Sequence, residues 1–344
     1  MKNHLFDQSN NNLMQTNNRD ISINPEKLRK TTLKIRHDIE RRHKDLLNEY
    51  PPEQYMNLLH NRPEMASYTY TPPELRRFCH NIIRQSDQRV LQWYHKLIIV
   101  SFIDKNRTTL HHINMPGSIK ELYVKSFERI VREIEINPDE FYEYPQDKFV
   151  KDLNICALKL IPMGPCVIEL SEIPASFLLK KGLSQFIKGV LFVSFQLGGF
   201  KPFYQIHTYR SGLAEFNEHE WDRAYLRIAD LLKIEGRVKG AFGSSWFVDP
   251  RIKLISPRLA YLKERFEQNG GEIFYLESTM EDVRNATLKS PTRRRLYKEG
   301  KYIPRKYMRI WPRKQLISWA ERYHTNNPEA MDVLASHRKK AMMQ

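Results

Sequence analysis

A histidine and several carboxylates lie close together in the stretch FYQIHTYRSGLAEFNEHEW, which runs from residue 203 to residue 221. His207 falls near the end of a predicted strand, and Glu215 follows in the loop before the next predicted helix. Open α/β sheets bind ligands at the carboxyl ends of their strands. A histidine beside a carboxylate can accept a proton while the carboxylate orients its ring. His207 and Glu215 are therefore candidate general bases, and the plainer alternative is a polar surface loop.

The same stretch leaves a metal-dependent enzyme open as an alternative. His207 and His219, with the acids around them, are ligand types that suit zinc or iron. The spacing H-E-x-x-H is missing, so we predict no bound metal. The three cysteines form no C-x-x-C pair, which argues against a zinc knuckle or a disulfide framework and favours a reducing, cytoplasmic compartment.

Two serines and a predicted helix start are candidate binding groups for an anionic ligand. Ser244 and Ser245 follow two glycines in a predicted strand, outside any G-x-S-x-G pattern, so we expect them to donate hydrogen bonds rather than act as nucleophiles. Ser256 followed by Pro257 predicts the start of a helix, whose first amides can bind an anion. Arg258 would lie in the first turn of that helix.

The most basic stretch, SPTRRRLYKEGKYIPRKYMRIWPRK over residues 290–314, holds ten Lys or Arg and one acid. Arginine binds phosphate in a bidentate manner, which makes Arg293 and Arg294 candidate phosphate ligands. Neighbouring positions on a helix cannot share one face, so only part of the triple arginine can point to one site. The net charge of +16 also predicts an anionic partner. Nucleic acid or a membrane surface, contacted through basic helices at 26–50 and 290–314, remains an alternative to a phosphorylated small molecule.

The first part of the chain reads as helical. We expect a tail over residues 1–25, a helical region over 26–147, an α/β domain over 148–330 and a second tail over 331–344. Within the helical region, Thr71 is a predicted cap of one helix that continues to Ile103. Ser118 followed by Glu121 predicts a capping box at the start of another helix.

The second part alternates between strand and helix patterns. Residues 153–162 and 166–171 predict a hairpin, and residues 173–197 predict one long, largely buried helix. The alternation in KYMRIW predicts a last strand with half of its side chains buried. We therefore expect an α/β fold, with a mixed, partly parallel central sheet and helices on both faces, preceded by the helical N-terminal region.

A family resemblance lies in the stretch NATLKSPTRRRLYKEGKYIP. Together with the strand–helix order from residue 237 to residue 315, it resembles the Asn-Ala … Leu-Tyr-x-x-x-Gly-Phe signature of the GCN5-related N-acyltransferases (GNAT-like enzymes). The matching residues are Asn285, Ala286, Leu296, Tyr297 and Gly300, and Tyr302 stands where the family has Phe. The resemblance covers about a quarter of the chain.

The resemblance implies an acyl-CoA-dependent N-acyltransferase that acts on an unknown amine, with acyl-CoA or acetyl-CoA as its co-substrate. It implies that Tyr297 protonates the departing thiolate. The glycine-rich pyrophosphate loop of the family is missing after SSWFVD, where the sequence continues PRIKLISPRL. We expect the helix after Ser256, Arg258 and the arginine cluster to bind the phosphates in place of that loop.

Overall fold

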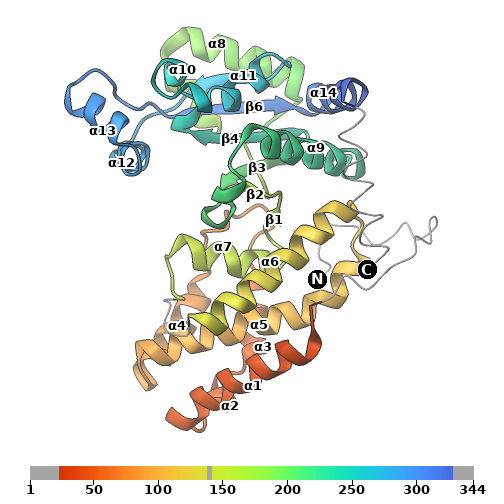
Figure 1. Ribbon diagram of the computed structural model, residues 1–344, viewed down its shortest axis with the longest axis vertical. Coiled ribbons are helices and arrows are strands. Elements are labelled where there is room, and N and C mark those ends of the chain that lie inside the picture. Colours follow the sequence, from red (N-terminus) through yellow and green to blue (C-terminus); the bar gives the residue numbers. More distant parts are fainter. Residues whose placement is uncertain (1–22, 138–141, 328–344) are drawn as a thin grey trace. The chain divides into compact units, whose positions relative to one another are not determined.

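The computed structural model describes residues 23–137 and 142–327 and divides the chain into two compact units (Figure 1). Unit 1 comprises the chain up to Ser171 together with residues 207–216, and unit 2 comprises residues 172–206 and the chain from Asn217 onward. Apart from residues 23–25, the two predicted tails lie outside the described residues. The chain therefore passes between the units at residues 171, 206 and 216.

Unit 1 is a bundle of helices around one long, buried helix, α5, as predicted for the N-terminal region (Figure 1). Helix α5 packs against α1, α3, α4, α6 and α7. The helices of this unit are α1 (Pro25–Arg42), α2 (Leu46–Glu49), α3 (Pro52–His60), α4 (Pro73–Gln85), α5 (Gln88–His112), α6 (Gly117–Ile136) and α7 (Asp147–Cys156).

Three local predictions in this unit are wrong, each because another residue ends or begins a helix. The predicted helix to Ile103 breaks after Gln85, since the Asp87 carboxylate accepts a hydrogen bond from the Val90 amide at 2.9 Å and starts α5. Thr71 caps nothing, because α4 begins after Pro72. Similarly, α6 begins after Pro116, without the predicted capping box of Ser118 and Glu121.

The predicted hairpin is present but shorter than expected. Strand β1 (Ile161–Pro162) pairs antiparallel with β2 (Cys166–Ser171), and Ile161 lies opposite Ile168. Residues 153–156 belong instead to α7. Phe149, Val150 and Leu153 are all buried at helical spacing, so the pattern that looked strand-like is the apolar face of a helix.

Unit 2 is built on a mixed sheet with strand order β3-β4-β6-β5, which confirms the predicted fold class (Figure 1). Strand β3 runs parallel to β4, whereas β6 is antiparallel to both β4 and β5. The recorded β3–β4 register pairs are Tyr204↔Ala241 and Gln205↔Phe242, before β3 continues into unit 1. The strands are β3 (Phe203–Thr208), β4 (Gly240–Ser245), β5 (Glu272–Tyr275) and β6 (Tyr307–Pro312).

Helices cover both faces of this sheet, and Figure 1 shows α8 and α9 on opposite sides of it. One face packs Phe242, Met308 and Phe274 against the segment that contains α8. The other packs Trp311 against aromatic side chains of α9, α11 and α14. The elements of the first face are η1 (Ala175–Leu179), α8 (Gly182–Phe192) and the π-helix η2 (Val193–Leu197); those of the second are α9 (Glu218–Ile234), α11 (Tyr261–Glu267) and α14 (Arg313–Asn326).

Two further predictions are corrected by this packing. All six residues of β6 are buried, because the strand lies between β4 and β5 and both faces of the sheet are covered. The prediction that only half of the side chains in KYMRIW are buried is therefore wrong. The long, largely buried helix predicted over 173–197 breaks at Gly182, whose φ of +71° favours glycine, and most residues of α8 are exposed rather than buried. The remaining elements are η3 (Arg210–Glu215) in unit 1 and η4 (Trp246–Val248), α10 (Ile252–Ile255), η5 (Pro257–Leu259), α12 (Met280–Thr287) and α13 (Pro291–Lys298) in unit 2.

Candidate active site

The candidate site centres on His207, whose ring is bonded to a buried carboxylate in unit 1. His207 Nε2 lies 2.9 Å from Glu169 Oε1. The Glu169 side chain is 2 % exposed and that of His207 is 15 % exposed, so the carboxylate is enclosed while the ring still reaches solvent. The second oxygen of Glu169 accepts a hydrogen bond from the Tyr68 backbone amide at 2.7 Å. Glu169 is thereby fixed from two sides and orients the imidazole.

Tyr68 and Arg62 complete the surroundings of this pair. The ring of Tyr68 lies edge-on to the His207 ring, with 4.7 Å between centroids. Arg62 donates a hydrogen bond to Asn154 Oδ1 at 2.8 Å. Burial lowers the pKa of Arg62, and the negative charge of Glu169 acts in the opposite direction. Arg62 therefore places a positive charge near the buried carboxylate.

The chain immediately after His207 is anchored by a buried lysine. Lys151 on α7 is 5 % exposed and donates a hydrogen bond to the Thr208 carbonyl at 2.7 Å. Its ammonium also contacts Asp147 Oδ2 at 2.8 Å, and Asp147 Oδ1 accepts the hydroxyl of Tyr68 at 3.0 Å. Lys151 and Asp147 thus connect Thr208, the residue after His207, to Tyr68, whose ring contacts the imidazole.

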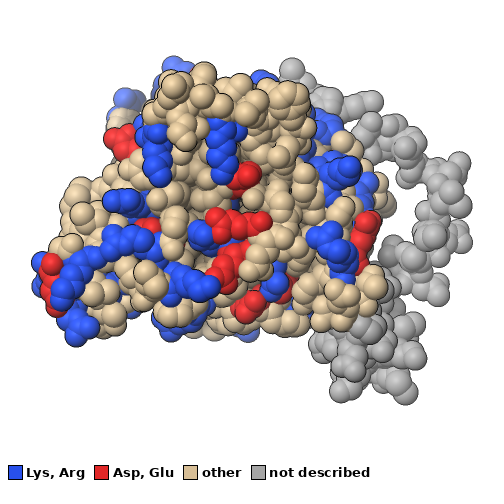
Figure 2. All heavy atoms as spheres, turned by 90° about the horizontal axis from the view of Figure 1, so that it is seen from above, with Lys and Arg blue, Asp and Glu red and all other residues tan. Residues whose placement is uncertain are grey.

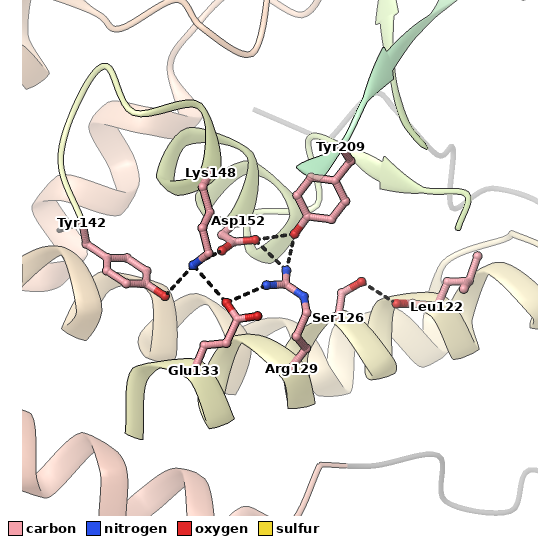
Figure 3. Close-up of polar contacts among 8 residues, drawn as sticks. All are labelled: Leu122, Ser126, Arg129, Glu133, Tyr142, Lys148, Asp152 and Tyr209. Carbon is pink, nitrogen blue, oxygen red and sulfur yellow. Dashed lines mark hydrogen bonds and ion pairs between the residues drawn. The ribbon is translucent and has the colours of Figure 1, made fainter. Parts of the chain in front are cut away.

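A second polar network fixes Tyr209, two residues beyond His207 (Figure 3). Asp152 is fully buried and accepts hydrogen bonds from Arg129 at 2.6 Å and from the Tyr209 hydroxyl at 2.5 Å. Arg129 also contacts the Tyr209 hydroxyl. Lys148 and Glu133 extend the network, with Lys148 Nζ 2.9 Å from Glu133 Oε2 and 3.4 Å from Asp152 Oδ2. The network ties the end of β3 to α6 and α7.

The pKa values in this network follow from burial and mutual attraction. Burial by itself lowers the pKa of Arg129, but Asp152, Tyr209 and Glu133 raise it overall. The pKa of Glu133 falls despite its burial, because Lys148 and Arg129 bond to it. Burial, followed by the charge of Asp152, raises the pKa of Tyr209 well above its usual value. Arg129 and Glu133 therefore stay charged, and Tyr209 stays neutral and donates.

The arrangement around His207 suits proton abstraction. An ionised carboxylate only accepts hydrogen bonds, so the bond to Glu169 assigns the proton to Nε2 and leaves the lone pair on Nδ1. Within the described residues, Nδ1 has no recorded hydrogen-bond partner. A histidine with one nitrogen bonded to a buried carboxylate and the other unoccupied has the form of an oriented general base.

The carboxylate beside His207 is Glu169, and the other acids and histidine of the predicted stretch lie elsewhere. Glu215 is exposed at the end of η3. His219 is exposed in the first turn of α9, in unit 2. Among the described residues, no three His, Cys, Asp or Glu side chains are placed to hold a metal ion.

In unit 2 the structure brings together Ser256 and Arg293, but they bond to each other. Arg293 is buried, donates to Ser256 Oγ at 2.9 Å and to the Ala286 carbonyl at 2.6 Å, and lies over the Trp246 ring at 4.5 Å. Helical structure does begin at Pro257, as predicted, but only as the three residues of η5, without a side-chain cap from Ser256, and α11 begins at Tyr261. Burial lowers the pKa of Arg293, and the charge of nearby Arg258 lowers it further.

The other predicted residues of unit 2 differ in how accessible they are. Arg258 and Arg294 are exposed, and Arg294 donates to the Leu288 carbonyl at 2.6 Å. Tyr297 on α13 is half-buried, as is Ser244 at the end of β4. Ser245 is half-buried as well, and its hydroxyl accepts the Phe247 amide at 3.2 Å. Arg258, Arg294 and Ser244 are thus the members of the predicted set that remain open to a ligand.

The basic stretch does not form one continuous exposed stripe. Arg293 and Arg309 are buried, and Arg309 donates to the Leu262 carbonyl at 2.7 Å. Arg313 donates to the Glu235 and Val238 carbonyls at 2.9 and 3.1 Å. Arg293, Arg309 and Arg313 thus donate hydrogen bonds to backbone carbonyls of unit 2, as the exposed Arg294 does.

Sequence reasoning missed most of the partners of His207. Glu169 carried a usable signal, because it is the one charged residue in the otherwise uncharged strand CVIELS. Buried charges need partners, so such a residue points to a nearby cation or donor. Tyr68, Lys151 and Asp152 lie in helical or loop segments far away in sequence and gave no comparable signal.

Comparison with known proteins returned only distant structural matches. No protein-family model and no curated protein matches the chain. An acyltransferase in complex with decanoyl-CoA matches with a TM-score of 0.45 at 10 % identity, over 76 % of each chain. An acyltransferase mutant in complex with octanoyl-CoA matches with a TM-score of 0.41 at 10 % identity, over 85 % of this chain and 81 % of the other. An acyltransferase in complex with decanoyl-CoA and teicoplanin gives a TM-score of 0.40 at 12 % identity, over the same shares. Every one of these TM-scores lies below 0.5.

Proposed function

We propose that the chain is an acyl-CoA-dependent N-acyltransferase in which His207, oriented by Glu169, deprotonates the acceptor amine. The observation that carries the proposal is the contact of 2.9 Å between His207 and a carboxylate that is 2 % exposed. The contact leaves Nδ1 as the basic atom of a ring that reaches solvent. The acyl-CoA part of the proposal rests on the resemblance of residues 237–315 to the GNAT-like enzymes.

In the proposed reaction, the amine nitrogen attacks the thioester carbonyl while its proton passes to His207 Nδ1. The C–S bond then breaks, the new amide forms, and the thiolate of CoA takes a proton. Tyr297 is the proposed donor of that proton, on the strength of the family resemblance. Glu169 stabilises the imidazolium that forms, because a buried negative charge next to His⁺ favours the protonated ring.

The phosphates of the co-substrate require cations that are free to bind them. Arg258 and Arg294 are the exposed candidates in unit 2, and the half-buried hydroxyl of Ser244 is a further candidate donor. Among the described residues, no acidic side chain contacts the buried Arg293, whose charge adds to that of nearby Arg258 and makes the local field positive. The proposed co-substrate is an acyl-CoA or acetyl-CoA and the proposed acceptor is an amine, both on the strength of the family resemblance.

The test combines binding with mutant kinetics. Isothermal titration should detect binding of CoA and of acyl-CoA esters, and release of free thiol in the presence of a panel of amines should report turnover. His207→Gln should lower kcat/KM about 10²- to 10⁴-fold, the usual contribution of a general base. Glu169→Gln should lower it by a smaller factor and shift the pH–rate profile. His80→Gln, at an exposed histidine in unit 1, is the matched control.

Two results would refute different parts of the proposal. Absence of CoA and acyl-CoA binding removes the acyl-transfer reaction altogether. Turnover that survives His207→Gln but is lost in Glu215→Gln makes Glu215 the base and removes the role of the His207–Glu169 pair.

A further inference from the structure

Helix α8 and the π-helix η2 carry a row of exposed apolar side chains on the side that faces away from the sheet. The spacing of these residues is mostly three or four, which places them along one face of the helix. Their exposed fractions range from 39 % to 82 %, and the residues are Leu183, Phe186, Ile187, Leu191 and Phe195. We call this row the outer face of α8.

The opposite side of the same segment already packs in the core of unit 2. Phe192, Val193 and Leu197 belong to the buried cluster that contains Phe274 and Met308. The segment is therefore apolar on both sides. A helix of this kind is normally covered on both sides, and a contiguous exposed apolar patch marks an interaction surface.

The charges around the outer face are all of one sign within the segment. Residues 173–202 contain four lysines and no acid. Lys180 and Lys188 form ion pairs with Glu277 and Glu272, which belong to the chain around β5, and Lys201 lies 3.6 Å from Glu172. Lys181 is exposed and forms no such pair within the described residues. Figure 2 looks onto the side of unit 2 that carries α8 and shows Lys and Arg side chains, with Asp and Glu side chains among them, beside uncharged surface.

We propose that the outer face of α8 lies in the interfacial layer of an anionic membrane. Leucine, isoleucine and phenylalanine side chains would enter the boundary between headgroups and acyl chains, as in interfacial amphipathic helices. Lys181 would extend to the lipid phosphates, because a long side chain keeps its charge in water while its stem covers apolar surface. The helix would lie parallel to the membrane plane.

A second copy of the chain fits the outer face less well than a membrane does. Two copies related by a twofold axis would bring the same lysines together on both sides of the contact, and like charges at an interface oppose association. Anionic lipid phosphates complement those lysines instead. The proposal does not depend on the acyltransferase function, because the residues of the outer face are separate from the His207 site.

Vesicle co-sedimentation of the full chain, without any acyl-CoA, tests the proposal. The protein should pellet with vesicles of phosphatidylcholine and phosphatidylglycerol in a molar ratio of about 2:1, and less with phosphatidylcholine alone. Leu183→Ser/Leu191→Ser should weaken binding about tenfold or more, since two large apolar groups no longer enter the interface. Lys181→Glu should weaken binding only to the anionic vesicles. Leu33→Ser/Ile136→Ser is the control, because both residues are exposed apolar side chains of unit 1.

Three outcomes would overturn the proposal. The protein fails to pellet with either vesicle; or Leu183→Ser/Leu191→Ser pellets as well as the control; or light scattering without lipid shows a dimer that the same double variant dissociates. The last result would assign the outer face to a second copy. Circular dichroism of each variant separates loss of binding from loss of folding, and exposed positions are expected to tolerate the change.

Discussion

Replacement of Arg129 by methionine should destabilise unit 1 by about 3 kcal/mol, because it leaves a buried charge without its strongest partner. Asp152 is fully buried, and Arg129 is the closest cation to it, at 2.6 Å. In the variant, Asp152 would retain the hydroxyl of Tyr209 at 2.5 Å and Lys148 at 3.4 Å. The more distant lysine and one neutral donor replace only part of the interaction with the guanidinium.

A double substitution separates the cost of the unpaired charge from the loss of packing. Arg129→Met/Asp152→Asn removes both charges, and the asparagine oxygen can still accept the Tyr209 hydroxyl. The double variant should therefore recover about 1–2 kcal/mol relative to Arg129→Met alone. Glu133 is still compensated in both variants, because Lys148 lies 2.9 Å away from it.

Urea unfolding at neutral pH, followed by circular dichroism at helical wavelengths, measures these differences. Arg107→Met is the matched control: Arg107 is 28 % exposed and lies 3.0 Å from Asp104, whose side chain is 63 % exposed. An exposed pair of this kind contributes less than about 1 kcal/mol. Arg129→Met could lower the free energy of unfolding no more than Arg107→Met does, with no recovery in the double variant. Asp152 would then not require Arg129, and the proposed charge pairing in this network would be wrong.

Two further substitutions test buried groups outside the site. Burial lowers the pKa of His95 to about 4, although its bond to the Tyr142 carbonyl acts in the opposite direction. In the unfolded chain the histidine pKa is near 6.5, so as the pH falls the unfolded chain takes up a proton on His95 before the folded chain does. The folded state therefore loses about 3 kcal/mol of stability between pH ~6.5 and pH ~4. His95→Gln should flatten the pH dependence of the urea midpoint, and an unchanged slope between these pH values would contradict the assignment. The Tyr302 hydroxyl is buried without a recorded partner in the part of the chain that the structure describes. Tyr302→Phe should leave unit 2 unchanged or stabilise it by about 1 kcal/mol in thermal unfolding, and a loss of that size would reveal a missing partner.

The sequence predicted those elements whose local signals agree with their packing. Asn217 accepts the Glu220 amide and starts α9, the helix predicted to follow the loop that holds Glu215. Ser290 with Pro291 separates α12 from α13. Gly198, with φ of +66°, ends the π-helix after α8. In each case one residue type fixes the backbone, so no knowledge of the neighbouring elements is needed.

Predictions that depended on a neighbouring element were less successful. Burial of β6 on both faces follows from its place between β4 and β5, and nothing within KYMRIW encodes that place. Arg293 was predicted to bind phosphate, yet Ser256, 37 residues away, and the ring of Trp246 enclose it. Side-chain types limited the possible chemistry, but the tertiary packing decided which partner each charge took.

The segment that carries His207, residues 207–216, belongs to unit 1 although the residues before and after it belong to unit 2. Its own contacts in unit 1 must therefore hold it in place. The segment is anchored chiefly by polar contacts: Lys151 binds the Thr208 carbonyl and Asp152 binds Tyr209. A Cβ atom at Gly212 would lie 2.6 Å from the Gly164 carbonyl, so close approach requires glycine there.

Polar anchors of this kind contribute little net stability compared with apolar packing, because burial of each charge costs desolvation. They are, however, directional, since a hydrogen bond to a charged group loses most of its value when the donor and acceptor move out of line. Anchors immediately after His207 therefore restrict the position of its ring more tightly than apolar contacts of equal strength would. A general base depends on that placement, because a displacement of about 1 Å can cost 10²-fold in rate. We infer that the buried charges on α6 and α7 contribute more to the position of His207 than to stability. Tyr209→Phe should accordingly raise the activation free energy calculated from kcat by more than it lowers the free energy of unfolding. Equal changes in the two free energies would contradict this inference.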